Sequence, residues 1–216
     1  MRYLSILVLS VFIVSCGNNK ENRKVAEPVT DPTDTLDKLL DIKNEAELIQ
    51  RFGRENVTWD TVFGAEGAVS MATLLYRGTK DQVEIVWKNQ KTKTGVLKVT
   101  LTAYYDEMDE QMITATRWKT SYGINLGTSL LELEKMNEVP FIFFGFGWDY
   151  GGIVSEFNGG KLSTLPMSIQ LGITDVSKYG ENPDYEMLMG DNEYNSDDPE
   201  AQRLNPVVIS ISFLKK

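Results

Sequence analysis

Short segments in which apolar and polar residues alternate constrain the fold of this 216-residue chain more than any other feature. Between residues 57 and 118 apolar residues recur at every second position, which is the period of a strand with one buried face. Turn-forming stretches at 77–81 and 89–92 separate neighbouring segments, and strands joined by short turns pair antiparallel. The pattern predicts strands at Val57–Val62, Val69–Tyr76, Val83–Lys88, Val96–Tyr104 and Met112–Trp118.

Signals for short helices come before this series and again after it. Asp34–Ile42 carries leucines at helical spacing. Asn44 is expected to cap a second helix, with a glutamate three residues later as in a capping box, and Gly53 to end it. Ser129 is expected to cap a third helix in the same way, with Asn137 as its left-handed stop. The later strands are predicted at Pro140–Phe146, Gly151–Phe157, Met167–Ile173 and Val207–Leu214.

This order of elements predicts an α+β fold in which short helices pack on antiparallel sheet. The helix-plus-sheet pattern occurs twice, which predicts two tandem repeats. Residues 34–122 would form the first half and residues 123–216 the second. An acidic loop at 174–200 would belong to the second half.

The N-terminus carries a short apolar run, residues 3–14, that ends next to the only cysteine. The run is shorter than the roughly 20 residues of a membrane span and is typical of a secretory signal peptide. Ile13-Val14-Ser15-Cys16 resembles the bacterial lipobox. The resemblance implies a signal peptide over 1–15 and a lipid on Cys16 that attaches the protein to the membrane. The polar stretch with Pro28 and Pro32 that follows predicts a flexible tether over 16–33. The residue after Cys16 is Gly17 and not an acidic residue, which resembles the pattern that sorts lipoproteins to the outer membrane. We therefore expect the protein in the cell envelope, anchored by its lipid at the outer membrane. The alternative is an exported protein with an incidental cysteine.

The composition excludes several classes of chemistry. The chain has no histidine, which removes the commonest general base at neutral pH, the Ser–His and Cys–His nucleophile pairs, and the commonest transition-metal ligand. Its net charge of −9 argues against a nucleic-acid partner. We therefore expect no enzymatic activity, no catalytic residues, no metal site and no cofactor.

A longer pattern begins at Gly123 and continues through Asn137 to Pro140-Phe141. A glycine-led loop opens a short helix that ends before a proline and a hairpin. This pattern resembles the repeat of beta-lactamase-inhibitor-protein-like domains and of the small lipoproteins of the outer-membrane barrel-assembly machinery. The likeness covers residues 123–173 and, by order of elements alone, 34–118. It implies helices on one face of an antiparallel sheet and a protein-binding or assembly role without catalysis.

The stretch Gly145–Gly152 (GFGWDYGG) contains the candidate binding residues Trp148, Asp149 and Tyr150. Their flat rings and carboxylate suit a sugar ring or a partner side chain, whereas the alternative is a hairpin whose aromatic rings pack inward. The function we expect is that of an envelope lipoprotein that holds a protein partner on an exposed sheet face. A glycan- or small-ligand-binding lipoprotein using Trp148 and Tyr150 is the alternative, and a carboxylate-dependent hydrolase ranks last.

The acidic segment 174–200 is expected to be a solvated surface excursion. Oxygen-bearing side chains alternate over Asp191–Asp197 and faintly resemble a calcium loop. However, Ser196 and Gln202 stand where an EF-hand needs a glycine and a bidentate glutamate. Calcium is therefore the lesser alternative for this segment.

Overall fold

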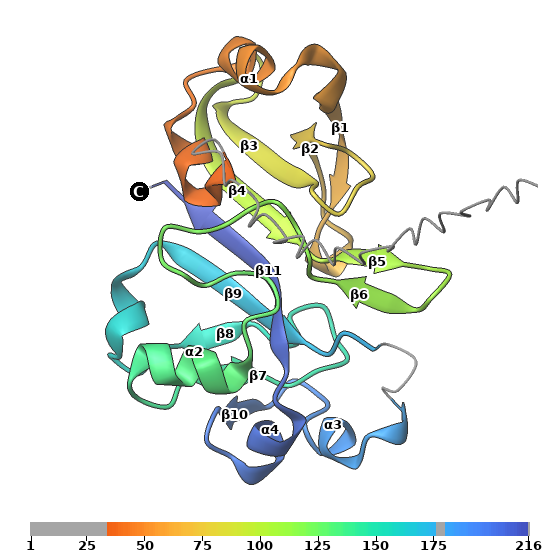
Figure 1. Cartoon of the computed structure of the whole chain (residues 1–216), viewed down its shortest axis with the longest axis vertical. Coiled ribbons are helices and arrows are strands. Elements are labelled where there is room, and N and C mark those ends of the chain that lie inside the picture. The colour runs from red at the N-terminus through yellow and green to blue at the C-terminus, as the bar shows by residue number, and fades with distance from the viewer. Residues whose placement is uncertain (1–33, 176–179, 216) are drawn as a thin grey trace, which may run out of the picture.

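A six-stranded antiparallel sheet dominates the computed structural model, which describes residues 34–175 and 180–215 (Figure 1). Its strand order is β1-β2-β3-β4-β11-β9. The predicted signal peptide, the lipidation site at Cys16 and the tether lie outside the described residues. Within the described residues, no helix has both the length and the apolar character needed to cross a membrane.

The strands agree closely with the alternating pattern at most positions. The main sheet comprises β1 (Val57–Phe63), β2 (Val69–Leu75), β3 (Val83–Asn89), β4 (Thr94–Thr102), β9 (Met167–Gly172) and β11 (Val207–Leu214). One small sheet comprises β10 (Glu193–Asn195), β7 (Ile142–Phe144) and β8 (Val154–Glu156), and the other comprises β5 (Tyr104–Asp106) and β6 (Gln111–Ile113). The prediction of a strand continuing to Trp118 is wrong, because β6 ends at Ile113 and the chain then leaves the sheet.

The helices are short, as expected for an α+β fold of this kind. They are η2 (Leu36–Asp41), α1 (Glu45–Phe52), η3 (Arg54–Asn56), η4 (Ala65–Gly67), α2 (Leu130–Asn137), η5 (Lys161–Thr164), α3 (Pro183–Met187) and α4 (Pro199–Leu204), where η marks a 3₁₀ helix. The Asn44 side chain accepts a hydrogen bond from Glu47 N at 2.9 Å, which confirms the predicted cap. Ser129 and Glu132 form a reciprocal capping box at the start of α2.

The end of α2 differs from the prediction. The left-handed residue is Glu138, with φ 67°, and Asn137 is the last helical residue. The Asn137 side chain is fully buried. Its amide donates to Val139 O at 2.8 Å and to Phe157 O at 2.9 Å, and its Oδ1 accepts from Leu162 N at 3.1 Å. Asn137 therefore connects the end of α2 to the segment that follows β8.

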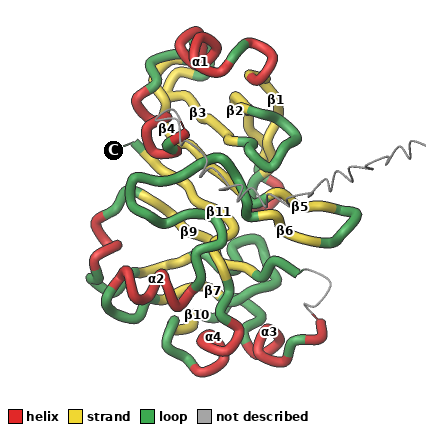
Figure 2. Tube along the Cα trace, in the orientation of Figure 1, coloured by secondary structure: helices red, strands yellow, loops and turns green. Residues whose placement is uncertain are grey.

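The core lies between one face of the main sheet and a layer of helices and loop. Ile85, Trp87 and Val99 are fully buried members of the sheet side, and Leu36 and Leu39 of η2 pack against them. Figure 2 shows that the long irregular segment between β6 and α2 crosses the same face. Its backbone is fixed to β11, because Gly127 N donates to Val208 O at 2.8 Å and Val208 N donates to Thr128 O at 2.8 Å. One face of the sheet is thus covered along much of its length.

The main sheet joins the two predicted halves of the chain. β4, from the first half, pairs with β11, from the second, in a register that places Leu101 opposite Ile211. The α+β architecture with short helices and antiparallel sheet is confirmed. The tandem repeat stays a prediction.

The described residues of the acidic segment, 174–175 and 180–200, form more regular structure than a solvated excursion would. It contains α3, β10 and the start of α4, and β10 pairs with β7. Tyr185 and Leu188 are buried and belong to the hydrophobic core. Ser196 is also buried, where its hydroxyl accepts from Phe141 N at 2.9 Å and donates to the Glu134 carboxylate. In the described part of the chain, no group of three acidic, histidine or cysteine side chains lies close enough together to hold a metal ion.

The first described residues are held by the segment that follows β6. Leu36 N donates to Lys119 O at 2.8 Å, and Lys119 N donates to Asp34 O at 3.0 Å. The Arg117 guanidinium pairs with the Asp34 carboxylate at 2.9 Å. Two backbone hydrogen bonds and one ion pair therefore hold the start of the domain in place.

Candidate functional site

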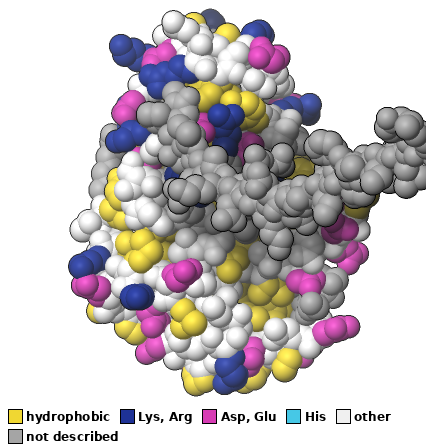
Figure 3. Space-filling model, viewed as in Figure 1, with side chains coloured by type: hydrophobic (Ala, Val, Ile, Leu, Met, Phe, Trp, Pro, Cys, Tyr) yellow, Lys and Arg dark blue, Asp and Glu magenta, His cyan; other side chains and the backbone are white. Residues whose placement is uncertain are grey.

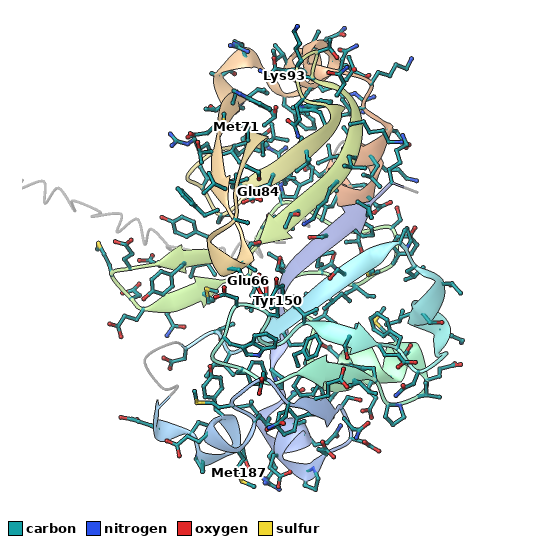
Figure 4. The ribbon with its side chains drawn as sticks, turned by 180° about the vertical axis from the view of Figure 1, so that it is seen from behind. Glu66, Met71, Glu84, Lys93, Tyr150 and Met187 are labelled. Carbon is teal, nitrogen blue, oxygen red and sulfur yellow. The ribbon has the colours of Figure 1, made fainter. Side chains whose placement is uncertain are left out.

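The face of the main sheet opposite the helices is open. Side chains alternate across a strand, so the residues between the core positions of β3, β4, β11 and β9 point away from the helix layer. Figure 4 shows this side with no helix across these four strands and with Glu84 of β3 on it. We call this surface the open face, and its residues on these strands are Glu84, Val86, Lys98, Thr100, Thr102, Ser168, Gln170, Ser210, Ser212 and Leu214.

Hydroxyl side chains line the centre of the open face. Thr100 and Ser212 share a hydrogen bond of 2.9 Å across β4 and β11, and Thr102 and Ser210 share one of 3.0 Å. Such cross-strand pairs stabilise a sheet. Because these side chains are short, the centre of the open face lies lower than the residues that border it.

Two adjoining cavities hollow the open face. The first, of about 580 Å³, has a floor of β4, β11 and β9 and a wall that includes Ile153, Leu165 and Pro166. The second, of about 450 Å³, has Glu84 and Thr102 in its lining. We call them the Lys98 cavity and the Glu84 cavity, after the charged residue that each contains, and Thr100 lines both. Both volumes fall within the range of about 300–1,000 Å³ that is usual for ligand sites.

The two cavities contain side chains of opposite charge. Glu84 lies opposite Thr100 in the sheet register, so Lys98 is its diagonal neighbour. Burial raises the pKa of Glu84 above its ordinary value, and the positive charge of Lys98 opposes this rise to a smaller extent. Among the described residues, none forms a hydrogen bond or an ion pair with the Glu84 carboxylate. A half-buried carboxylate without a partner is unfavourable for stability.

Exposed aromatic side chains form the border of the Glu84 cavity. Phe63, at the end of β1, is 80% exposed, and Tyr104 and Tyr105, on β5, are 40% and 44% exposed. Sequence reasoning missed these three residues and Glu84. The one available signal was an apolar residue at the end of an alternating strand, next to a turn. The alternating pattern alone does not identify which face of the sheet stays uncovered.

The predicted binding residues Trp148, Asp149 and Tyr150 belong to the loop beside the open face, since Trp148 and Asp149 line a cavity together with Gln170 of β9. The Trp148 and Tyr150 rings meet edge to face at 5.2 Å, so the structure brings these two together. Trp148 is 37% exposed, and its Nε1 donates to Gly145 O at 2.9 Å. Asp149 has a different role from the one predicted for a ligand contact, because its Oδ2 accepts from Glu66 N at 2.5 Å. Figure 4 shows Glu66, from the β1–β2 hairpin, beside Tyr150.

Trp148 and Asp149 also line a third cavity, of about 370 Å³, together with Tyr185. The two sequence-based interpretations of the loop, as a binding loop and as a packed hairpin, both stay predictions. Trp148 and Tyr150 pack against each other, as in a hairpin with inward-facing rings, while Trp148 keeps an exposed surface.

The side of the molecule opposite the open face has a different character. Figure 3 shows this side, where acidic and basic side chains of the described residues are interspersed over the helices and loops.

No family model, no curated protein and no solved structure matches this chain. The geometry of the open face is therefore the basis for the functional proposal.

Proposed function

We propose that this protein is a lipid-anchored lipoprotein of the cell envelope, without enzymatic activity, that binds another envelope protein on its open face. The observation that carries the proposal is a hydroxyl-lined sheet face, uncovered by helices and hollowed by two cavities, with exposed aromatic side chains at its border.

The chemistry of the open face supports a polypeptide partner. Aromatic residues are enriched at protein interfaces, where each buries a large rigid surface at little entropic cost. Hydroxyl groups such as those of Thr100 and Ser212 adapt to the backbone donors and acceptors of a partner. The floor is built on paired strands, and a rigid base of this kind lowers the cost of ordering on binding. The tandem helix-plus-sheet repeat belongs to the same proposal, since it would make the open face a joint surface of both halves.

Attachment to the membrane depends on Cys16 in this proposal. We expect Cys16→Ala to release the protein from membranes, because each acyl methylene contributes about 0.8 kcal/mol of binding and stable anchoring needs more than one chain. Fractionation of cells that express either form, together with the mass of the mature N-terminus, measures this. A Cys16→Ala protein that is processed and retained at the membrane like the wild type would exclude the lipid anchor.

The test of the binding function is co-purification from gently solubilised native membranes. The wild-type chain should recover an envelope protein in a fixed ratio. Ser168→Arg places a long charged side chain at an exposed position of the open face and should abolish this recovery. Asn192→Arg adds the same charge at an exposed position before β10 and should leave it intact. Equal recovery by the two variants would exclude the open face as the binding surface.

The alternative function is the binding of a glycan or small ligand by Trp148, Asp149 and Tyr150. The observation in its favour is the cavity of about 370 Å³ beside the half-exposed Trp148 ring. The same co-purification separates the two functions. Recovery of the wild-type chain alone would favour the ligand-binding function, and Trp fluorescence during glycan titration would then be the next measurement.

A further inference from the structure

We propose that the protein partner inserts an arginine or lysine side chain into the Glu84 cavity, where its positive charge pairs with the Glu84 carboxylate. This inference rests on the proposed function and specifies the chemistry of the partner.

Glu84 lies on β3, at one side of the open face, and is half-buried in the free protein. In the described part of the chain, no donor or cation pairs with its carboxylate, and burial raises its pKa. A charged group held in this way is stabilised by an incoming cation more than an exposed carboxylate is, because the surroundings screen the interaction less. The cavity therefore favours a basic group over a neutral or acidic one.

Lys98 does not fill this role. It is the nearest basic residue in the sheet register, yet no ion pair within 4.0 Å joins it to Glu84 among the described residues. Lys98 lines the adjoining Lys98 cavity, whereas Glu84 lines its own. Tyr104 and Tyr105 also line the Glu84 cavity, but a phenol side chain supplies no positive charge. Among the described residues, the Glu84 carboxylate thus faces its cavity without an ion-pair partner.

The aromatic rings at the border can contact both the methylene chain and the charged group of a basic side chain. Phe63, Tyr104 and Tyr105 are exposed and line the same cavity as the carboxylate. A guanidinium or ammonium group over an aromatic ring gains about 0.5–2 kcal/mol, more when water is excluded. The methylene stem of the same side chain would cover apolar ring surface. A macromolecular partner is required to bury Phe63, because a ring that is 80% exposed extends beyond the cavity itself.

A metal ion suits the cavity less well. Among the described residues, Glu84 is the single carboxylate in its lining. Hard cations such as calcium take six to eight oxygen ligands. In the part of the chain that the structure describes, no cluster of three candidate ligands exists. One carboxylate beside aromatic rings matches a side-chain cation instead.

The experiment measures the binding of two short peptides to the intact lipidated protein in nonionic detergent micelles. The first probe is Ac-Gly-Gly-Arg-Gly-Gly-amide, and the second carries neutral citrulline in place of arginine. We expect the arginine peptide to bind at least about tenfold more tightly than the citrulline peptide, and Glu84→Gln to remove this difference. Ligand-observed NMR titration gives both dissociation constants. Equal affinity of the wild-type protein for the two peptides would overturn the inference.

Two controls separate a local effect from general attraction or misfolding. Glu107→Gln removes an exposed carboxylate near the tip of the β5–β6 hairpin and should leave the tenfold preference unchanged. If Glu107→Gln lowers the preference as much as Glu84→Gln does, the acidic surface as a whole attracts the peptide and the inference is wrong. Thermal unfolding should show that Glu84→Gln is folded and at least as stable as the wild type at pH 7.

The expected sign of this stability effect follows from the raised pKa of Glu84. The folded protein holds the proton of Glu84 at a pH where the unfolded chain has released it, so wild-type stability falls as the pH rises from the ordinary glutamate range through the raised value. Glu84→Gln lacks this loss. A merely structural role for Glu84 would give the opposite result, a less stable variant.

Failure of this inference is distinguishable from failure of the proposed function. If Glu84→Gln still co-purifies the envelope protein as well as the wild type does, while Ser168→Arg does not, the open face binds a partner but not through a basic side chain at Glu84. If neither variant changes recovery, the binding surface itself is wrong.

Discussion

Replacing Gly152 with alanine is expected to destabilise the protein by about 4 kcal/mol or more, which is a large share of the roughly 5–15 kcal/mol that stabilises a typical domain. Gly152 has φ 77°, a left-handed conformation that alanine adopts unfavourably. A Cβ at this position would overlap the carbonyl oxygen of Leu171 and would lie 3.1 Å from the Phe146 ring. The backbone has little room to move away, since Gly152 N donates to Phe144 O at 2.9 Å and Gly152 O accepts from Leu171 N at 2.8 Å. The soluble yield and the urea midpoint of the variant measure the loss.

Gly159→Ala is the matched control. Gly159 also has a positive φ, 71°, but no atom lies within 4 Å of the position that its Cβ would take. The expected loss is about 1–2 kcal/mol, which is the backbone contribution alone. Similar losses in the two variants would mean that the close approach of Gly152 to Leu171 is not what requires a glycine there.

Replacing Asn137 with alanine is expected to lower the free energy of unfolding by about 2–4 kcal/mol. The substitution removes three hydrogen bonds at once and leaves Val139 O, Phe157 O and Leu162 N without their partner in a buried environment. Urea unfolding followed by Trp fluorescence measures the change.

An exposed asparagine with a single hydrogen bond serves as the control for Asn137. The Asn89 side chain accepts from Thr92 N at 3.0 Å in an exposed turn. Asn89→Ala should lower the free energy of unfolding by less than about 1 kcal/mol, because water replaces the lost group. If Asn137→Ala were no more harmful than Asn89→Ala, the buried amide would not be what connects α2 to the segment after β8.

The elements that the sequence predicts well are those fixed by local interactions. Asn44 and Ser129 cap α1 and α2 through bonds to residues three positions away, so the signal and the structure share one short segment. The alternation in β1–β4 is equally local, because each strand pairs with its neighbour through a short turn.

Where the prediction was wrong, a distant part of the chain decides the structure. Trp118 looks like the end of a strand, but its indole is buried and donates to Asp81 O at 2.8 Å, which draws the segment after β6 away from the sheet. The acidic composition of 174–200 similarly hid Tyr185 and Leu188, which are buried. Both features depend on contacts between residues that lie tens of positions apart in the sequence. The alternation of apolar and polar residues carries no information about such contacts.

The candidate site, like the fold, could be predicted only in part from the sequence. An exposed sheet face was expected from the sequence, but the residues that form it were not identified. Glu84 alternates with Val83 and Ile85 as any outward-facing residue of a strand would. Its unusual position becomes visible only when the helix layer is seen to cover the opposite face and β5 is seen to bring Tyr104 and Tyr105 beside it.

The way the chain enters its domain has a mechanical consequence. If the N-terminal segment tethers the protein to a membrane, any pulling force from a bound partner reaches the domain at Asp34. The force then acts first on the Arg117–Asp34 ion pair and on the hydrogen bonds between Lys119 and residues 34–36. These bonds share the load before it reaches Leu36 and Leu39 in the core. The segment 117–119 would thus bear a force on the tether first, and η2 would stay folded while the tether is pulled.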